Sequence, residues 1–131
     1  VMVTADDEIT VSGTIDAGYD AVITSNMASI EISGDVTAGN DVTLTSDTST
    51  TITSTVTATA GTIDIDAGTT ISSTGALTAG DAITLTAAAG TTLSATADLL
   101  AGAGGITITG SLTTAADMRS NNGEILLTGP V

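Results

Sequence analysis

The sequence predicts an all-β protein, a parallel β-solenoid (β-helix) of about six coils, each with 19–22 residues and three short strands. Three observations predict this fold. A phrase recurs about every 20 residues, apolar and polar residues alternate within each copy, and small side chains dominate a chain that is only 1% aromatic. Such a repeat can bury its apolar residues only by stacking one copy on the next around a narrow core.

The repeat is clearest in the segment 13–25. This segment recurs 21 positions later as 34–46, and a further 41 positions along the chain as 75–87. A weaker copy lies between them near Thr55–Ala58, so the period is 20 to 21 residues. A long period of this kind favours a solenoid over a β-sandwich, whose turn signals recur every ~8–12 residues without a longer repeat.

Each period contains three alternating segments, whose apolar residues align as columns from copy to copy. The first column is Ile9, Ile30, Ile52, Ile71, Leu93 and Leu112. The second is Ile15, Val36, Val56, Leu77, Leu99 and Met118. The third consists of the pairs Ala21/Ile23, Val42/Leu44, Ile63/Ile65, Ile83/Leu85, Ile106/Ile108 and Ile125/Leu127. Because the inward side chains of a strand recur at every second residue, six periods of three segments predict eighteen strands and no helix.

Small residues separate the second and third segments of most periods. They are Gly18, Gly39, Gly80 and Gly102, with Asn121 and Asn122 near this position in the last period. Glycine and asparagine tolerate positive φ angles, so these residues are predicted to form corners of the coil.

Composition excludes several classes of protein. Fifteen acidic residues against one base, Arg119, give a net charge of -14. Nucleic acids and anionic membrane surfaces both require clusters of basic residues, so we expect no nucleic-acid partner. No apolar stretch is long enough for direct membrane insertion. A hydrophobic fraction of 41% argues against disorder, and we expect one solenoid domain over residues 1–131, either an excerpt of a longer chain or a subunit of a filament.

These repeats resemble the haemagglutinin-type repeats of filamentous-haemagglutinin-like adhesins, which are exported by two-partner secretion. The likeness lies in phrases such as 36–45 and 82–87, and it extends from about Ile9 to Leu127. It implies a parallel β-helix in a rod-shaped extracellular or cell-surface protein that has no catalytic activity along its repeats. The sequence departs from the family in having no lysine, and the family's secretion domain is not evident in it.

No catalytic, cofactor-binding or metal-binding residues are predicted, and the protein is not expected to be an enzyme. Without His, Cys or Lys, the abundant Ser and Thr hydroxyls have no conventional base, and only Arg119 could polarise a substrate. Arg119 follows Asp117 closely in the sequence, which favours an exposed residue in a weak local ion pair.

The acidic residues suggest weak calcium binding without a dedicated site. Asp20 and Asp41 occupy equivalent corners of successive copies, and Asp64 and Asp66 share an outward face. Calcium prefers six to eight oxygen ligands, which these pairs do not supply. Stacked acids such as Asp20 and Asp41 are expected to repel one another.

Threonine pairs in the third segments suggest a second kind of binding face. The pairs are Thr43/Thr45, Thr84/Thr86 and Thr107/Thr109, and flat threonine arrays on solenoids can organise water and bind ice. Val22, Asp64, Asp66 and Leu126 interrupt this array. The β propensity of threonine accounts for the pairs without any ligand.

We therefore expect a non-catalytic extracellular structural solenoid, either a stalk segment of an adhesin or a subunit of a cell-surface or matrix filament. End coils expose strand edges and apolar columns, which predicts self-association by end-to-end coil stacking. For a stalk, the expected partner is a host or cell-surface glycan or a protein receptor. The alternative is a binding module whose outward Thr and Asp faces bind glycan, calcium or ice.

Overall fold

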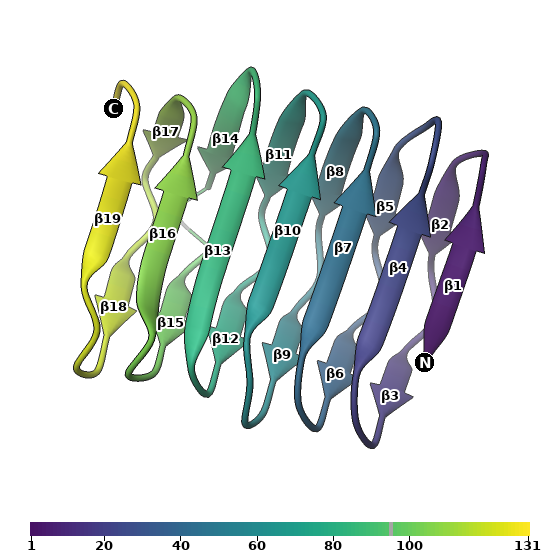
Figure 1. Cartoon of the computed structure of the whole chain (residues 1–131), viewed down its shortest axis with the longest axis horizontal. Coiled ribbons are helices and arrows are strands. Elements are labelled where there is room, and N and C mark those ends of the chain that lie inside the picture. Colours follow the sequence, from purple (N-terminus) through teal and green to yellow (C-terminus); the bar gives the residue numbers. More distant parts are fainter. Residues whose placement is uncertain (95) are drawn as a thin grey trace.

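The computed structural model describes residues 1–94 and 96–131, which form the predicted parallel β-solenoid of about six coils. The front strands in Figure 1 all point upward; the chain then crosses the top, returns behind them and reappears one strand further left, which is a right-handed winding. The described residues contain nineteen strands and no helix. Accordingly, none of them belongs to a helix that could cross a membrane.

Each coil contributes one strand to each of three parallel sheets, which we call A, B and C. Sheet A lies at the front of Figure 1 and contains β1 (Met2–Ala5), β4 (Ala21–Ser25), β7 (Val42–Ser46), β10 (Ile63–Ala67), β13 (Ala82–Ala87), β16 (Gly105–Thr109) and β19 (Ile125–Thr128). Sheet B contains β2 (Ile9–Val11), β5 (Ile30–Ile32), β8 (Ser49–Ile52), β11 (Thr70–Ser73), β14 (Gly90–Leu93) and β17 (Leu112–Thr114). Sheet C contains β3 (Ile15–Ala17), β6 (Val36–Ala38), β9 (Val56–Ala58), β12 (Leu77–Ala79), β15 (Leu99–Ala101) and β18 (Met118–Ser120).

The strand count exceeds the predicted eighteen because β1 adds a seventh strand to sheet A. Its residues pair with β4 in register, from Met2 beside Val22 to Ala5 beside Ser25. This segment carries only the end of the repeated phrase, where Val3 and Thr4 match Ile23 and Thr24, and the predicted columns began later, at Ile9.

The strand registers confirm the second and third columns. In sheet C, Ile15 pairs with Val36 and Val36 with Val56, and the column continues through Leu77 and Leu99 to Met118. In sheet A, Ile23, Leu44, Ile65, Leu85, Ile108 and Leu127 form a single ladder. Both columns point into the tube, because the inward position of a strand repeats every second residue.

The first column was wrong, because it combined two neighbouring ladders of sheet B. Ile30 pairs with Thr50 instead of Ile52, and Ile71 pairs with Thr91 instead of Leu93. The true ladder therefore runs through Ile9, Ile30, Thr50, Ile71, Thr91 and Leu112. Ile52 and Leu93, two positions after Thr50 and Thr91, also point inward. Because the prediction followed only apolar residues, it chose Ile52 and Leu93 in place of the two threonines.

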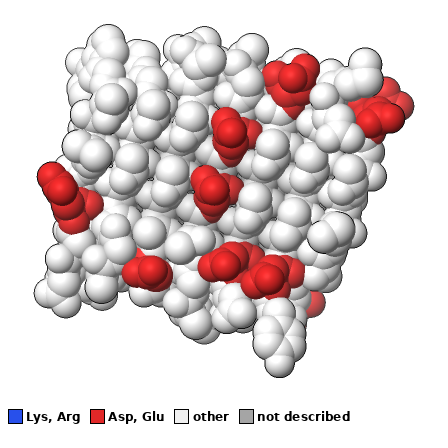
Figure 2. Space-filling view, in the orientation of Figure 1, with Lys and Arg blue, Asp and Glu red and all other residues white. Residues whose placement is uncertain are grey.

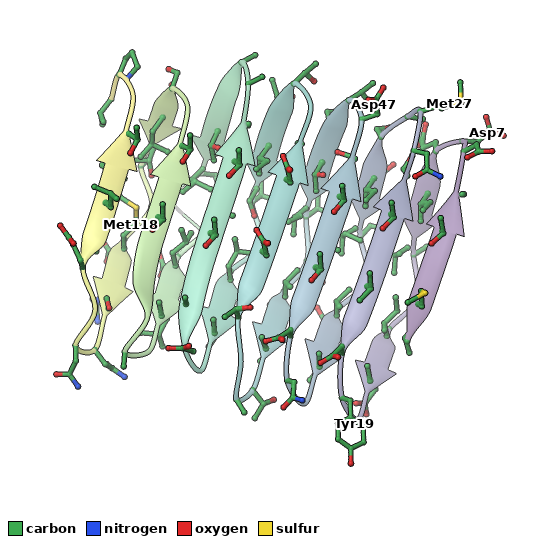
Figure 3. The ribbon with its side chains drawn as sticks, viewed as in Figure 1. Asp7, Tyr19, Met27, Asp47 and Met118 are labelled. Carbon is green, nitrogen blue, oxygen red and sulfur yellow. The ribbon has the colours of Figure 1, made fainter. Side chains whose placement is uncertain are left out.

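The core is as narrow as the composition predicts. Its buried side chains are almost all Ile, Val, Leu and Ala, and the central Leu44, Ile65 and Leu85 are completely inaccessible to solvent. Tyr19, the one aromatic residue, is 78% exposed and points away from a corner in Figure 3. Large rings are therefore unnecessary, because each coil closes around its own short aliphatic side chains.

The predicted glycine corners are present, but their physical reason differs from the expected one. Gly18, Gly39, Gly80 and Gly102 are not among the described residues with positive φ. At Gly39, a Cβ atom would collide with the carbonyl oxygen of Gly18 in the preceding coil. Glycine is required there because successive corners stack backbone on backbone.

A buried hydroxyl without a partner is the main defect of the core. In one coil, the buried hydroxyls of Ser46 and Thr50 lie 2.9 Å apart and form a hydrogen bond. Two coils further on, Ala87 and Thr91 occupy the same positions, and the Thr91 Oγ1 atom has no partner in the described residues. A buried hydroxyl without a partner costs ~1–3 kcal/mol.

We expect Ala87→Ser to stabilise the protein by about 1 kcal/mol, because the new hydroxyl supplies the missing partner of Thr91. The matched control is Ala67→Ser in the coil between, where the residue equivalent to Thr91 is Ile71 and carries no hydroxyl. That control should be destabilising. Chemical denaturation of both variants checks the prediction, and a loss of stability in Ala87→Ser would contradict it.

Candidate functional site

The outward face of sheet A carries a regular pattern of side chains. Its side chains form two rows across the seven strands. We call the first the threonine row, and it contains Thr4, Thr24, Thr45, Asp66, Thr86, Thr109 and Thr128. The second, the mixed row, contains Met2, Val22, Thr43, Asp64, Thr84, Thr107 and Leu126.

The structure places all three threonine pairs that the sequence singled out on this one face and brings two of them into contact. Thr84 and Thr107 are direct neighbours, as are Thr86 and Thr109, while β10 separates these pairs from Thr43 and Thr45. Sequence reasoning did not align the single threonines Thr4, Thr24 and Thr128 with this array, although their offset from the inward residues would have placed them there.

Two carboxylates interrupt the array at its middle strand. Asp64 and Asp66 are exposed on β10, the middle strand of sheet A. Figure 2 shows acidic side chains near the centre of this face as well as at its borders. Partial burial, followed by the nearby charge of Asp66, raises the pKa of Asp64 above its ordinary value. The predicted interruption is therefore real, and it concentrates negative charge on an otherwise uncharged sheet face.

Acidic corners form directional contacts between coils. The Asp41 N–H donates to Asp20 Oδ1 over 3.3 Å, and the Thr62 N–H donates to Asp41 Oδ1 over 2.7 Å. The Thr62 hydroxyl also donates to this Asp41 oxygen, at 3.2 Å. Each carboxylate therefore accepts a hydrogen bond from the coil that follows it. The expectation that Asp20 and Asp41 simply repel overlooked these backbone donors.

The same arrangement occurs at a second corner. Asp35 Oδ1 accepts hydrogen bonds from the Thr55 N–H at 3.1 Å and the Thr55 hydroxyl at 2.8 Å, and also from the Ser54 hydroxyl. Asp98 Oδ1 accepts from the Asp117 N–H at 3.2 Å. Each of these aspartates comes directly before a strand. This repeated position in the sequence could have been used to predict the contacts.

We expect the stability contribution of Asp35 to depend on pH. Hydrogen bonds from Ser54, and then from Thr55, lower the pKa of Asp35, so the folded state favours the carboxylate. This contribution is complete above the unfolded pKa of ~3.9 and is lost as pH falls through the lower folded pKa. Asp35→Ala should therefore lower the melting temperature at pH ~7 and change it less at pH ~2.

The control for this prediction is Asp16→Ala, which removes an exposed outward carboxylate of β3. Its effect should be small at both pH values. Thermal melts followed by circular dichroism provide the measurement, and an Asp35→Ala deficit that does not depend on pH would contradict the prediction.

The charged side chains of the described residues form one ion pair and no metal-binding group. No three His, Cys, Asp or Glu side chains of the described chain come close enough together to hold a metal ion. Arg119 forms the expected local ion pair with Asp117, at 3.6 Å, and both side chains are largely exposed. A shallow hollow beside Arg119 is lined partly by Thr78 and Leu100 on the outward face of sheet C.

The two end coils expose parts of the apolar ladders. At the first coil Val3 is exposed on β1, and at the last coil Ile125 is exposed on β19, whereas the exposed Met2 and Leu126 belong to the outward mixed row. Met118 is only partly buried in this last coil (Figure 3). The outer edges of β1 and β19 have no neighbouring strand in the described sheet, so their backbone groups are free to pair with further strands.

The chain matches no family model, no curated protein and no solved structure.

Proposed function

We propose that this chain is a non-catalytic structural rod, either a stalk segment of an extracellular or cell-surface adhesin or a subunit of a surface or matrix filament. The observation that carries the proposal is the continuity of three parallel sheets through every coil, with open edges at both end coils. The resemblance of the repeats to filamentous-haemagglutinin-like sequences supports the extracellular location and a glycan or protein receptor as partner.

The proposed role as a rod rests on the hydrogen bonds between successive coils. Every coil joins its neighbours through backbone pairs in all three sheets, and the corner carboxylates of Asp20, Asp41 and Asp35 add side-chain contacts in the same direction. A rod built in this way lengthens by adding coils to its ends, because an added coil finds both unpaired backbone groups and exposed apolar residues. Those coils belong either to the same polypeptide or to another copy.

Electron microscopy of the purified protein tests this function. We expect rods that grow into long fibres if separate copies stack end to end, and isolated short rods if the chain acts as a stalk segment. Compact particles with no preferred axis would contradict the proposal. Substituting the exposed inward residue Ile125 of the last coil with Lys should shorten any fibres, whereas Thr51→Lys, on the outward face of sheet B, should leave their length unchanged.

The alternative is a binding module that uses the outward face of sheet A. The threonine row favours this candidate, because six of its seven positions carry the same side chain. Ice recognition predicts thermal hysteresis by the monomeric protein, glycan recognition predicts binding on a glycan array, and calcium binding predicts a lower melting temperature in chelator. A negative result in all three assays would remove the alternative.

A further inference from the structure

We propose that the outward face of sheet A is a self-association surface for a second copy of this chain, and that Asp64 and Asp66 hold two copies apart while both carboxylates are ionised. This surface is lateral to the rod axis and separate from the end coils. It would bundle rods side by side, which goes beyond the proposed end-to-end growth.

The chemistry of the face suits another copy of itself. Apart from Asp64 and Asp66, its two rows consist of threonines with Met2, Val22 and Leu126, and none of these side chains is charged. Figure 2 shows an even surface with the other acids displaced to its borders. Methyl groups and hydroxyls on a flat sheet can pack against the same groups of a partner, as in the dry interfaces between stacked sheets.

The two acids lie at the centre of the face, so pairing of two faces would bring the acids of both copies together. Strand β10 is the middle strand of the seven, with three strands on each side. Two identical faces pair most simply about a two-fold axis, and an axis through the middle of the face places β10 opposite β10. Asp64 and Asp66 of one copy then meet Asp64 and Asp66 of the other, so four carboxylates would be buried together.

No nearby group neutralises this charge. The neighbouring strands present Thr43 and Thr45 on one side and Thr84 and Thr86 on the other. The remaining titratable groups near these strands are the corner residues Asp41, Asp47 and Asp81, which are also acids. The inner strands that pack against β10, namely β8, β9, β11 and β12, carry no titratable side chain.

Acid should weaken the repulsion between the carboxylates of two paired faces. The pKa of Asp64 is raised, first by burial and then by the charge of Asp66, so its protonation begins at a higher pH than for an ordinary aspartate. Once protonated, the Asp64 carboxyl group can donate a hydrogen bond to a threonine hydroxyl or to a carboxylate of the partner copy. The repulsion that opposes face-to-face pairing is then reduced.

The area of the face is sufficient for a weak dimer. Seven strands ~4.8 Å apart, each with about five residues at ~3.3 Å per residue, cover roughly 500 Å². Two such faces would bury roughly 1,000 Å² together, which is below the ~1,200 Å² of stable specific interfaces and within the range of weak, transient ones. We therefore expect a transient association that is detectable at high protein concentration.

The decisive experiment compares two double variants of equal charge by sedimentation equilibrium at neutral pH. Asp64→Asn/Asp66→Asn removes the charges from the face, and Asp16→Asn/Glu31→Gln removes two exposed charges from sheets C and B. We expect the first variant to associate more strongly at about 0.1–1 mM protein than the second, which keeps the charges of the face and shows only whatever end-to-end association both variants share. Equal behaviour of the two variants, whether both monomeric or both associated, would overturn the proposal.

Two further measurements keep the test independent of folding and of general charge loss. Asp64→Thr/Asp66→Thr, which matches the neighbouring strands, serves if the asparagine variant does not fold. The chain has no cysteine, so Asp64→Asn/Asp66→Cys should form a disulfide-linked dimer on oxidation, whereas Thr51→Cys on sheet B, combined with Asp64→Asn/Asp66→Asn, should not. Cross-linking at both positions to the same extent would show random collision and contradict the assigned interface.

Discussion

Leu85→Ala is expected to lower the free energy of unfolding by ~2–5 kcal/mol. Leu85 lies in the inward ladder of sheet A between Ile65 and Ile108 and is completely buried. Truncation removes aliphatic contacts with both neighbouring coils and leaves a cavity that a closed tube of short strands cannot collapse to fill. Urea denaturation followed by circular dichroism measures the loss.

The matched control is Leu127→Ala, the same substitution in the same ladder at the last coil. Leu127 is only partly buried and pairs on one side alone, with Ile108. Its truncation should cost less than about half as much, because less apolar area leaves water on folding. Equal losses for the two variants would mean that the core does not form one continuous ladder with exposed ends.

Gly39→Ala is expected to be the second strongly destabilising substitution, at about 1–3 kcal/mol. The added Cβ would be driven into the carbonyl oxygen of Gly18, and backbone atoms cannot swing aside as a flexible side chain can. Separation of the two corners would strain the Gly39 N–H donation to the Ala17 carbonyl, which is 2.9 Å long. Thermal and chemical denaturation should both register the change.

Gly18→Ala provides the comparison at the equivalent corner of the first coil. A Cβ at Gly18 would meet no atom within 4 Å, because no described coil precedes it. Its effect should therefore be close to neutral. If both alanine variants lost the same stability, backbone conformation would be the cause instead of the close approach of stacked corners.

The contrast between Gly18 and Gly39 illustrates what a sequence can and cannot predict in this fold. Both glycines follow alanine at the same point of the repeat, so the corners themselves were predictable. The reason for glycine was not, because the collision involves a carbonyl group 21 residues away in the chain. Positive φ is a local property, whereas close stacking exists only once the coils are assembled.

Sheet B shows the same division. Alternation in each copy predicted the strands correctly, yet Thr50 and Thr91 were left out of the inward ladder because threonine is usually found at the surface. Their burial follows from the register with Ile30, Ile71 and Leu112 in adjacent coils. A polar residue in an alternating strand does not reveal which face it occupies until its neighbours are known.

The candidate surfaces were predictable to a similar extent. The sequence identified the threonine pairs and the interrupting acids Asp64 and Asp66, because these residues lie at fixed offsets from the apolar ones. The complete threonine row and the position of β10 in the middle of sheet A emerged only from the strand order. The hydrogen bonds of Asp20 and Asp35 likewise depend on backbone donors of the next coil.

The sequence by itself determined the repeat, the period-two alternation and the choice of small aliphatic side chains, and these were enough to predict a parallel β-solenoid. Each of them is encoded within a single copy of about 20 residues. The tertiary structure decided the exact ladders, the reason for the corner glycines, the role of the corner carboxylates and the seventh strand of sheet A. These features depend on contacts between coils, whose energies are set by residues that become neighbours only when one coil lies on the next.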